Sequence, residues 1–395
     1  MSRIFVTGLG VISALGNSLE ENHHALVRGA CGLSSLELFE TRYAERLKFG
    51  EIKIETARLK AMLQASESDV TRTSLLALHA FQEAVAESKF TREELSAGDT
   101  ALIAASTVGG MCLTDELYHD ANSVSDGSPF TSSYDCASAA LYLQRRYAIG
   151  GIVNTINTAC SSSANAIMYG ARLIRNGLAK RAIVGGVDSL AKYTINGFNA
   201  LNILAPQDCR PFDRERKGLN LGEGAAFLVL EREEDCANKH KYAELSGYAN
   251  ANDAFHPSSL SENGEGPYRA MLGALAMTAS APDLIGYVNA HGTGTENNDE
   301  VESRALIRVF GQCPPFASAK SKIGHTLGAA AAVESVFSIL ALYHGEHYPS
   351  LGFSTPIEST GLTPVTEYGR HPFTRVMTNS FGFGGNCSSL IYSKV

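Results

Sequence analysis

Short apolar runs rich in β-branched residues alternate with amphipathic stretches of helical period along almost the whole chain. This alternation predicts mixed, largely parallel sheets covered by helices, and therefore an α/β fold. We expect strands over residues 3–7, 101–105, 151–156, 181–187, 225–231, 243–248, 285–290, 315–319, 375–380 and 388–393. We expect helices over residues 73–87, 138–147, 161–176, 268–279, 298–310 and 328–343.

No Pro-rich or Ser-rich linker divides the chain, so the charged stretch 231–241 is the expected seam between two halves, residues 1–233 and 234–395. The 395 residues are 44% hydrophobic and 19% charged, which is enough for a large core. The net charge of −8 is dispersed over both signs and gives no reason to expect nucleic-acid binding.

The cysteines and the apolar segments indicate the cellular compartment in which we expect the protein. Eight cysteines are scattered without a CxxC pair or a His/Cys cluster, so we expect neither a disulfide framework nor a metal site. The N-terminal apolar run is short and broken by glycines, which favours a first strand over a signal peptide. The apolar helix expected over 328–343 contains Glu334 and is too short to span a bilayer. We therefore expect a soluble, cytoplasmic protein with reduced thiols.

The N-terminal glycines resemble the start of a dinucleotide-binding fingerprint. Gly8 and Gly10 have the right spacing, but Ser13 takes the place of the third glycine. No acidic residue follows a second strand at the distance such a site needs. We expect a structural turn here, and no nucleotide cofactor.

Cys160, within Asn-Thr-Ala-Cys-Ser-Ser-Ser (157–163), is placed at the joint between an expected strand and an expected helix. A thiol at a helix N-terminus is surrounded by free backbone N–H groups, and its pKa falls from roughly 8.5 toward neutrality. The sequence therefore predicts a nucleophile. The alternative is an inert buried cysteine, because free cysteines are among the most often buried residues.

Three further segments end expected strands in polar or Gly-rich loops. They place His291, then Lys320 with His325, and then Phe383 at strand ends. Catalytic groups of α/β sheets collect at the carboxyl ends of strands. Each histidine alone would be read as a satisfied polar residue, but together with the cysteine they predict an active site.

At these residues the chain resembles β-ketoacyl-[acyl-carrier-protein] synthases of the elongating Cys-His-His type, in the thiolase-like superfamily. The resemblance implies the duplicated, five-layered αβαβα thiolase-like fold. It also implies a homodimer, with the cysteine in the first half and both histidines in the second. The matching segments, in order, are Val6-Thr-Gly-Leu-Gly-Val-Ile-Ser13, Thr158-Ala-Cys160, Gly185-Gly-Val-Asp188, Arg210-Pro-Phe-Asp-Arg-Glu-Arg216, Gly222-Glu-Gly224, His291-Gly-Thr293, Lys320 with His325, and Phe381-Gly-Phe-Gly-Gly385.

The resemblance implies a role for each matched residue. Cys160 would accept an acyl group from acyl carrier protein, and its N–H with that of Phe383 would form the oxyanion hole. His291 and His325 would stabilise the enolate that forms when a malonyl thioester loses carbon dioxide. Lys320 would hold position and charge near His325.

Further implied roles concern the walls of the site. Glu334 would order it, because an acid in an apolar helix is costly unless it is paired. Thr293 and Thr295 would hold the pantetheine arm, Phe383 would gate the acyl pocket, and Val108 would contact the substrate. No cofactor is expected.

The acidic acyl carrier protein is expected to dock on a basic patch. The competing interpretation is a solvated loop, because acidic residues are interleaved at 208, 213 and 215. The patch consists of Arg210, Arg214, Arg216 and Lys217.

Three departures from the family pattern suggest a specialised synthase, for example of a polyketide or polyene. After the expected gate the chain reads Gly384-Gly-Asn-Cys-Ser-Ser389, where elongating synthases usually have Gly-Gly-Thr-Asn. The stretch 107–137, which lines the acyl pocket near the dimer interface in relatives, is short. Ser66-Glu-Ser-Asp69 is acidic where relatives carry a basic docking helix.

Other functions stay open. The chain could be an acyltransferase or decarboxylase that loads Cys160 but condenses poorly. It could be a non-catalytic, chain-length-setting subunit of a heterodimer, although such partners typically lack the cysteine. A cysteine hydrolase would have no use for a second histidine. A thiolase would need a second catalytic cysteine, and Cys387 is expected to be structural instead.

Overall fold

The computed structural model describes residues 2–278 and 281–395, and at its centre is a ten-stranded mixed sheet. The strand order is β3-β2-β4-β5-β1-β6-β12-β11-β7-β8. From the β1–β6 junction outwards, each side has two antiparallel pairs and then two parallel pairs. The junction itself is only two residue pairs long, Phe5 with Glu244 and Val6 with Ala243. The chain is therefore built from two copies of one five-stranded unit.

All ten expected strands are present, most with shifted ends. A separate ribbon of β9 (Glu346–His347) and β10 (Gly369–Arg370) was not expected from the sequence. The strands of the large sheet are β1 Ile4–Ser13, β2 Thr100–Ala105, β3 Val153–Ile156, β4 Arg181–Asp188, β5 Gly224–Arg232, β6 Ala243–Asn252, β7 Tyr287–Asn289, β8 Phe316–Ala317, β11 Arg375–Phe381 and β12 Asn386–Ser393.

The six expected helices are also present. They are α3 Arg72–Ser88, α6 Ser138–Tyr147, α7 Ser162–Arg175, α9 Glu265–Thr278, α10 Glu296–Phe310 and α12 Ala330–His344. Residue 279, the last of the helix expected over 268–279, lies outside the described residues. The sequence missed several shorter helices, namely α1 Leu19–Val27, α2 Thr56–Met62, α4 Arg92–Ser96, α5 Thr114–Ser123, α8 Lys192–Ala200 and α11 Lys320–Ile323.

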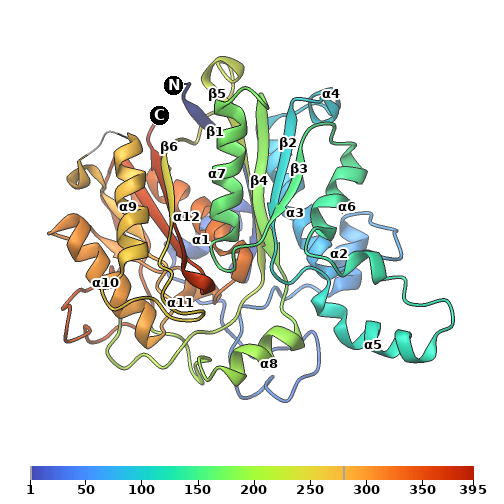
Figure 1. Cartoon of the computed structure of the whole chain (residues 1–395), viewed down its shortest axis with the longest axis horizontal. Helices are drawn as coiled ribbons and strands as arrows, with labels where there is room; N and C mark the ends of the chain where they lie inside the picture. Colours follow the sequence, from blue (N-terminus) through green and yellow to red (C-terminus); the bar gives the residue numbers. More distant parts are fainter. Residues whose placement is uncertain (1, 279–280) are drawn as a thin grey trace.

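The helices and the two halves of the sheet form five layers, which Figure 1 shows from one side to the other. Helices α3 and α6 cover the outer face of the first half, and α9 and α10 cover that of the second. Helices α7 and α12 pack on each other between the halves. This is the αβαβα arrangement that the family resemblance implied.

The expected N-terminal turn is wrong. Gly8 and Gly10 lie inside β1, which continues to Ser13. A Cβ atom at Gly8 would lie 2.3 Å from the carbonyl oxygen of Ala84, and one at Gly10 would lie 2.0 Å from that of Ala80. The glycines are therefore needed because they let the backbone of α3 approach the strand, and not because the chain turns there.

One described segment, Leu327–His344, is long and apolar enough to span a membrane, with a mean hydropathy of 1.4 over 18 residues. It includes α12, and 89% of the segment is buried. Because α12 packs on both halves of the sheet and on α7, its apolar residues are explained by the middle layer of the fold.

Candidate active site

Cys160 lies in a tight turn between β3 and α7. The preceding residue, Ala159, has a φ of +53°, a left-handed conformation that L-residues rarely adopt. The Ser162 hydroxyl holds the turn, because it accepts from the N–H of Thr158 at 2.8 Å and donates to the carbonyl of Ala159 at 2.5 Å. The sulfur is thereby held at the start of the helix, and only 7% of the residue is exposed.

The expected low pKa of Cys160 is wrong for the free enzyme. Burial raises the pKa of the Cys160 thiol to about 11, although Lys320 and the backbone N–H groups of Phe383 and Cys160 act in the opposite direction. Loss of water around the thiolate therefore outweighs its polar surroundings. The N–H groups of Phe383 and Cys160 both act on the sulfur, so they are placed to donate to the carbonyl oxygen of an acyl group bound there, which is what an oxyanion hole needs.

The structure brings Cys160, His291 and His325 together. The Cys160 sulfur and one ring nitrogen of each histidine all lie within 4.8 Å of one another. The two imidazole centroids are 5.4 Å apart, with ring planes at 82°. All three side chains are buried and line one cavity of about 460 Å³. Residues distant in sequence, from both halves of the fold, thus form one site.

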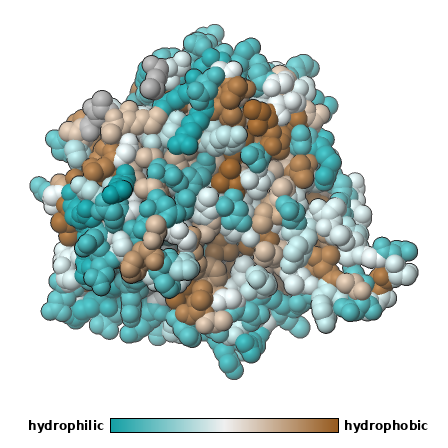
Figure 2. Space-filling view, viewed as in Figure 1, coloured by the Kyte–Doolittle hydropathy of each residue, from teal (hydrophilic) through white to brown (hydrophobic). Residues whose placement is uncertain are grey.

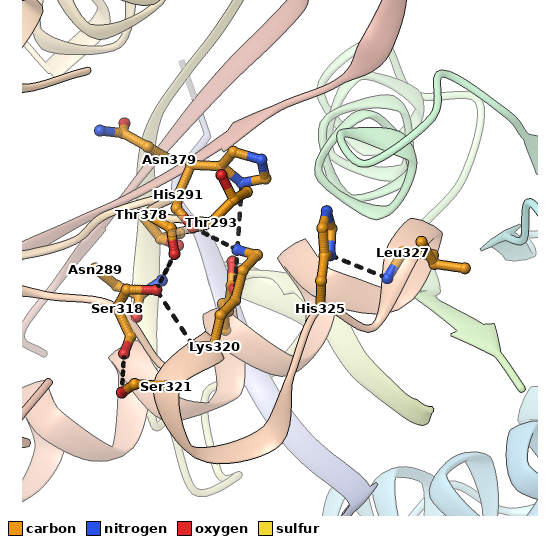
Figure 3. A network of polar contacts seen from close by, with 12 residues as sticks. Asn289, His291, Thr293, Ser318, Lys320, Ser321, His325, Leu327, Thr378 and Asn379 are labelled. Atoms are coloured by element: carbon orange, nitrogen blue, oxygen red, sulfur yellow. Dashed lines mark hydrogen bonds and ion pairs between the residues drawn. The ribbon is translucent and has the colours of Figure 1, made fainter. Parts of the chain in front are cut away.

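The hydrogen bonds of each histidine fix its tautomer. The Nζ of Lys320 lies 3.2 Å from Nδ1 of His291, and the N–H of Leu327 donates to Nδ1 of His325 at 3.2 Å (Figure 3). An ammonium and an amide N–H can only donate, so both Nδ1 atoms are acceptors. Burial, together with the charge of Lys320, lowers the pKa of both imidazoles well below 6.5. Each ring is therefore neutral and carries its hydrogen on Nε2.

Lys320 contacts His291 directly, and its charge also acts on His325, near which the family resemblance placed it. Its Nζ also donates to the carbonyl oxygen of His291 at 2.6 Å and to Oε1 of Glu334 at 2.5 Å. Lys320 and Glu334 are each 1% exposed, and neither lines the cavity. The pair therefore contacts the cavity wall through His291, while the charge of Lys320 also acts on Cys160 and His325. Burial raises the pKa of Glu334, and the charge of Lys320 opposes that rise.

Two carboxylates of α10, which the sequence did not single out, shape the His291 loop. Glu302 accepts from the N–H groups of His291 and of the next residue, both at 2.8 Å. Asp299 accepts from the N–H of Thr293 at 3.0 Å. The spacing of the two acids puts them on one helix face, and that is the signal that could have found them. The hydroxyls of Thr293 and Thr295 are 2.9 Å apart, and both residues line the cavity.

Phe383 stands at the cavity wall with 37% of its surface exposed. Its ring stacks on Phe198 of α8, with centroids 6.0 Å apart and planes at 16°. The stack covers one side of the cavity, where a gate is expected. Val108 is fully buried in an apolar cluster and does not line this cavity, so a direct substrate contact finds no support here.

Asn386, one of the departures noted in the sequence, links the two parts of the oxyanion hole. Its Oδ1 accepts from Ser161 at 2.9 Å, Asn165 at 2.9 Å and Asn250 at 3.0 Å. Ser161 adjoins the nucleophile, and Asn386 follows Phe383 by three residues. The sequence marked Asn386 only as unusual, because partners 136 to 225 positions away cannot be read from spacing.

Asp188 was quoted only as part of a motif, yet its fully buried carboxylate joins two loops. It accepts from the Ser106 hydroxyl at 2.8 Å and the Val108 N–H at 2.8 Å. It also accepts from the N–H of Gly328 at 2.7 Å, three residues after His325. Asp188 therefore ties the loop after β2 to the loop that carries His325.

The expected docking patch is only partly available. Arg216 is 6% exposed, and its guanidinium donates to the carbonyl oxygens of Asp213, Thr295 and Glu296. It therefore braces the end of the His291 loop and cannot meet a partner. Arg214 and Lys217 are exposed, and Lys217 lines the cavity, whereas Arg210 is half-buried.

The other departures also have structural counterparts. The stretch 107–137 includes α5, which has no buried residue and projects from the body of the protein in Figure 1. Glu67 lies 3.1 Å from Arg146 of α6, so its charge is partly paired within the chain. Cys387 is fully buried and does not line the cavity.

Three comparisons bear on the whole chain. Residues 1–236 match the family described as "Beta-ketoacyl synthase, N-terminal domain", and 242–354 match its C-terminal domain. The 3-oxoacyl-[acyl-carrier-protein] synthase 2 of Synechocystis is 30% identical over 99% of this chain and 98% of its own. A mitochondrial enzyme of that name from Arabidopsis thaliana is 31% identical over 100% and 93%. In the structure of a ketosynthase with its chain length factor from Xenorhabdus doucetiae, one chain has a TM-score of 0.89, with 31% identity over 100% and 98%.

Proposed function

Because the chain belongs to the β-ketoacyl synthase family, we propose that it is a β-ketoacyl-[acyl-carrier-protein] synthase that holds its acyl intermediate on Cys160. The observation that carries this function is the meeting of Cys160, His291 and His325 within 4.8 Å at one cavity. A nucleophile beside two neutral N–H donors suits a reaction in which one thioester is attacked and another becomes an enolate.

In the first half-reaction the Cys160 sulfur attacks the carbonyl carbon of an acyl thioester on acyl carrier protein. The developing oxyanion accepts hydrogen bonds from the N–H groups of Cys160 and Phe383. The intermediate collapses with loss of the pantetheine thiolate, which takes up the proton that the Cys160 thiol gave. With a thiol pKa of about 11, that proton has to leave as the substrate arrives.

In the second half-reaction a malonyl thioester occupies the cavity. The carboxylate leaves as carbon dioxide, and the bonding electron pair becomes an enolate whose oxygen accepts from Nε2–H of His291 and His325. The enolate carbon then attacks the acyl carbonyl on Cys160 and expels the cysteine thiolate, which is reprotonated. The product is a 3-ketoacyl thioester two carbons longer. Neutral imidazoles suit this step because they bind the oxygen without a free acidic proton for the carbanion.

Intact-protein mass spectrometry tests both half-reactions. The purified chain is incubated with a panel of acyl carrier thioesters, and then with malonyl carrier protein. We expect an acyl adduct that is lost in Cys160→Ala, followed by a two-carbon-longer carrier product. His291→Ala and His325→Ala should still load but should suppress decarboxylation. An adduct that persists in Cys160→Ala would show that a different nucleophile operates.

A second candidate follows from the Xenorhabdus neighbour, whose structure pairs a ketosynthase with a chain length factor. This chain would then need, or would be, one member of such a pair. Cys160 favours the catalytic member, because the pairing partners typically lack the cysteine. Loading of Cys160 without elongation would indicate a missing partner, and no loading with any substrate would favour the non-catalytic subunit.

For the quaternary structure we propose a dimer that forms across β3. This strand is one edge of the large sheet, and an unpaired edge is a template for another strand. Apolar side chains gather on the same face beside α7 and β3 in Figure 2. Ile152 and Leu178, which flank these elements, are 37% and 61% exposed. Analytical ultracentrifugation should give twice the mass of one chain. The Ile152→Lys variant should give the mass of a single chain.

The acyl carrier protein would approach the cavity at the exposed Lys217, with the exposed Arg214 three residues before it in the chain. We also propose a specialised product such as a polyketide or polyene, on the strength of Asn386 and the short 107–137 stretch. Product analysis by mass spectrometry tests the proposed product.

A cytoplasmic location is our remaining proposal. Because a similar enzyme is mitochondrial, cell fractionation has to decide between the two compartments.

A further inference from the structure

The end of α12 brings two histidines and a glutamate together at a place that does not line the catalytic cavity. His23 comes from α1, His344 is the last residue of α12, and Glu346 is the first of β9. One nitrogen or oxygen atom of each lies within 4.8 Å of the other two. In the part of the chain that the structure describes, only this group and the catalytic trio converge in this way.

The Glu346 carboxylate is held in place by hydrogen bonds, as metal-binding carboxylates are. Its side chain is fully buried, and both carboxylate oxygens are oriented by neighbours. Oε2 accepts from Tyr348 at 3.0 Å, and Oε1 accepts from Tyr368 at 2.8 Å and from Arg370 at 3.3 Å. His23 Nε2 lies 2.8 Å from Oε2. Such outer hydrogen bonds keep metal-binding carboxylates in place, and here they leave Oε2 turned toward the histidines.

The two histidines lie face to face, with ring centroids 4.2 Å apart and planes at 10°. His23 is partly buried, whereas His344 is exposed. No hydrogen bond to the His344 side chain is seen among the described residues, so that ring can turn toward a shared ion. His344 also ends α12, and the carbonyl end of a helix carries partial negative charge that favours a cation.

We propose that His23, His344 and Glu346 bind a divalent cation of the Zn²⁺ class. Two imidazoles and one carboxylate are a donor set that suits zinc, and the exposed side leaves a fourth position for water. Binding replaces the His23–Glu346 hydrogen bond with two metal bonds, and the proton between them leaves to solvent or moves to the other nitrogen of His23. The positive charge of Arg370 on Oε1 weakens the site without blocking Oε2.

Such a site would fasten α1 to the end of α12, the helix that carries Glu334 and therefore supports Lys320. Its occupancy should raise the stability of the fold, because a ligand that binds only the folded state stabilises it by mass action. Mg²⁺ should bind poorly, because it prefers oxygen ligands in octahedral geometry.

The experiment uses untagged, full-length protein in the Cys160→Ala background, so that the catalytic trio cannot supply a thiolate. Zinc chloride is titrated by calorimetry, and the melting temperature is followed with zinc chloride and with magnesium chloride. We expect one zinc per chain and a rise in melting temperature with zinc alone. His23→Ala and His344→Ala should each weaken binding by more than about tenfold, because losing a ligand costs at least as much as losing an outer hydrogen bond.

His24→Ala is the matched control, because His24 neighbours His23 on α1 but does not belong to the converging group. It should bind zinc like the parent. Tyr348→Phe keeps all three ligands and should weaken binding to a smaller extent, which tests the site if a ligand variant fails to fold. Equal zinc binding by His23→Ala, His344→Ala and the parent would overturn the proposal. So would the absence of any binding in the Cys160→Ala parent.

Discussion

Replacement of Lys322 by methionine should stabilise the protein, and by an amount that depends on pH. Lys322 belongs to α11 and is 1% exposed. Its ammonium contacts the carbonyl oxygen of Pro349, and the adjacent space of about 10 Å³ has room for about one water. Leu26 and Phe337 also line this space. Burial lowers the pKa of Lys322 from 10.5 to about 7.

The magnitude follows from this pKa difference. A shift of 3.5 units, 10.5 minus 7, corresponds to about 5 kcal/mol at 1.36 kcal/mol per unit. The folded pKa lies below the unfolded pKa, so between pH 7 and 10.5 the unfolded chain binds the extra proton. The free energy of unfolding of the parent therefore rises with pH across that window. Below pH 7 it is lowered by the full cost of burying the ammonium. Methionine removes that cost but leaves the Pro349 carbonyl without its donor, a loss of about 1–3 kcal/mol.

Urea unfolding of parent and Lys322→Met at pH 6, 8 and 10, at one protein concentration, measures the difference. We expect the variant to be more stable by about 2–4 kcal/mol at pH 6, with the advantage shrinking by roughly 1.4 kcal/mol per pH unit above 7. Lys180→Met, at a side chain 53% exposed, is the control and should show a small, flat difference. A Lys322→Met advantage that stays constant from pH 6 to 10 would refute the reasoning.

Three other variants test separate parts of the structure. Gly10→Ala should lower the free energy of unfolding by about 3 kcal/mol or more, because its methyl group meets the backbone of α3; chemical denaturation measures this. Joint Arg214→Glu and Lys217→Glu should raise KM for carrier-bound substrates roughly tenfold, because like charges repel the acidic carrier. An equal effect on a small thioester would remove the docking role. Asn386→Leu should lower kcat roughly 10–100-fold with a smaller change in KM, because Ser161 beside the nucleophile loses its partner. An unchanged kcat would show that this link does not position the oxyanion hole.

The sequence predicted the long elements because hydrophobic period reports burial directly. All ten strands of the large sheet and its six principal helices were found in this way. Elements without a buried stripe were missed, and α5, with no buried residue, is the clearest case. Boundaries failed where packing overrides local propensity, as at Gly8 and Gly10, which break an apolar run in sequence but lie within β1.

The site shows the same limit. Strand-end placement, with the family resemblance, located Cys160, His291 and His325. The pKa values and ionic contacts of these groups could not be predicted in the same way, because they depend on what the fold packs around each group. The expected low pKa of Cys160 was therefore wrong, and the direct contact of Lys320 with His291 was not foreseen, although its charge also acts on His325.

The division of the site between two halves of the sheet has a consequence for a chain that is still being made. The nucleophile is synthesised at residue 160, but β12 (Asn386–Ser393) lies between β6 and β11 and follows the Phe383 amide in sequence. Until β12 leaves the ribosome the second half has no continuous sheet to hold Phe383 in place, so the cysteine lacks a complete oxyanion hole. A nascent chain stalled before β12 should therefore take no acyl label at Cys160. Unfinished copies would not trap acyl groups that the finished enzyme needs.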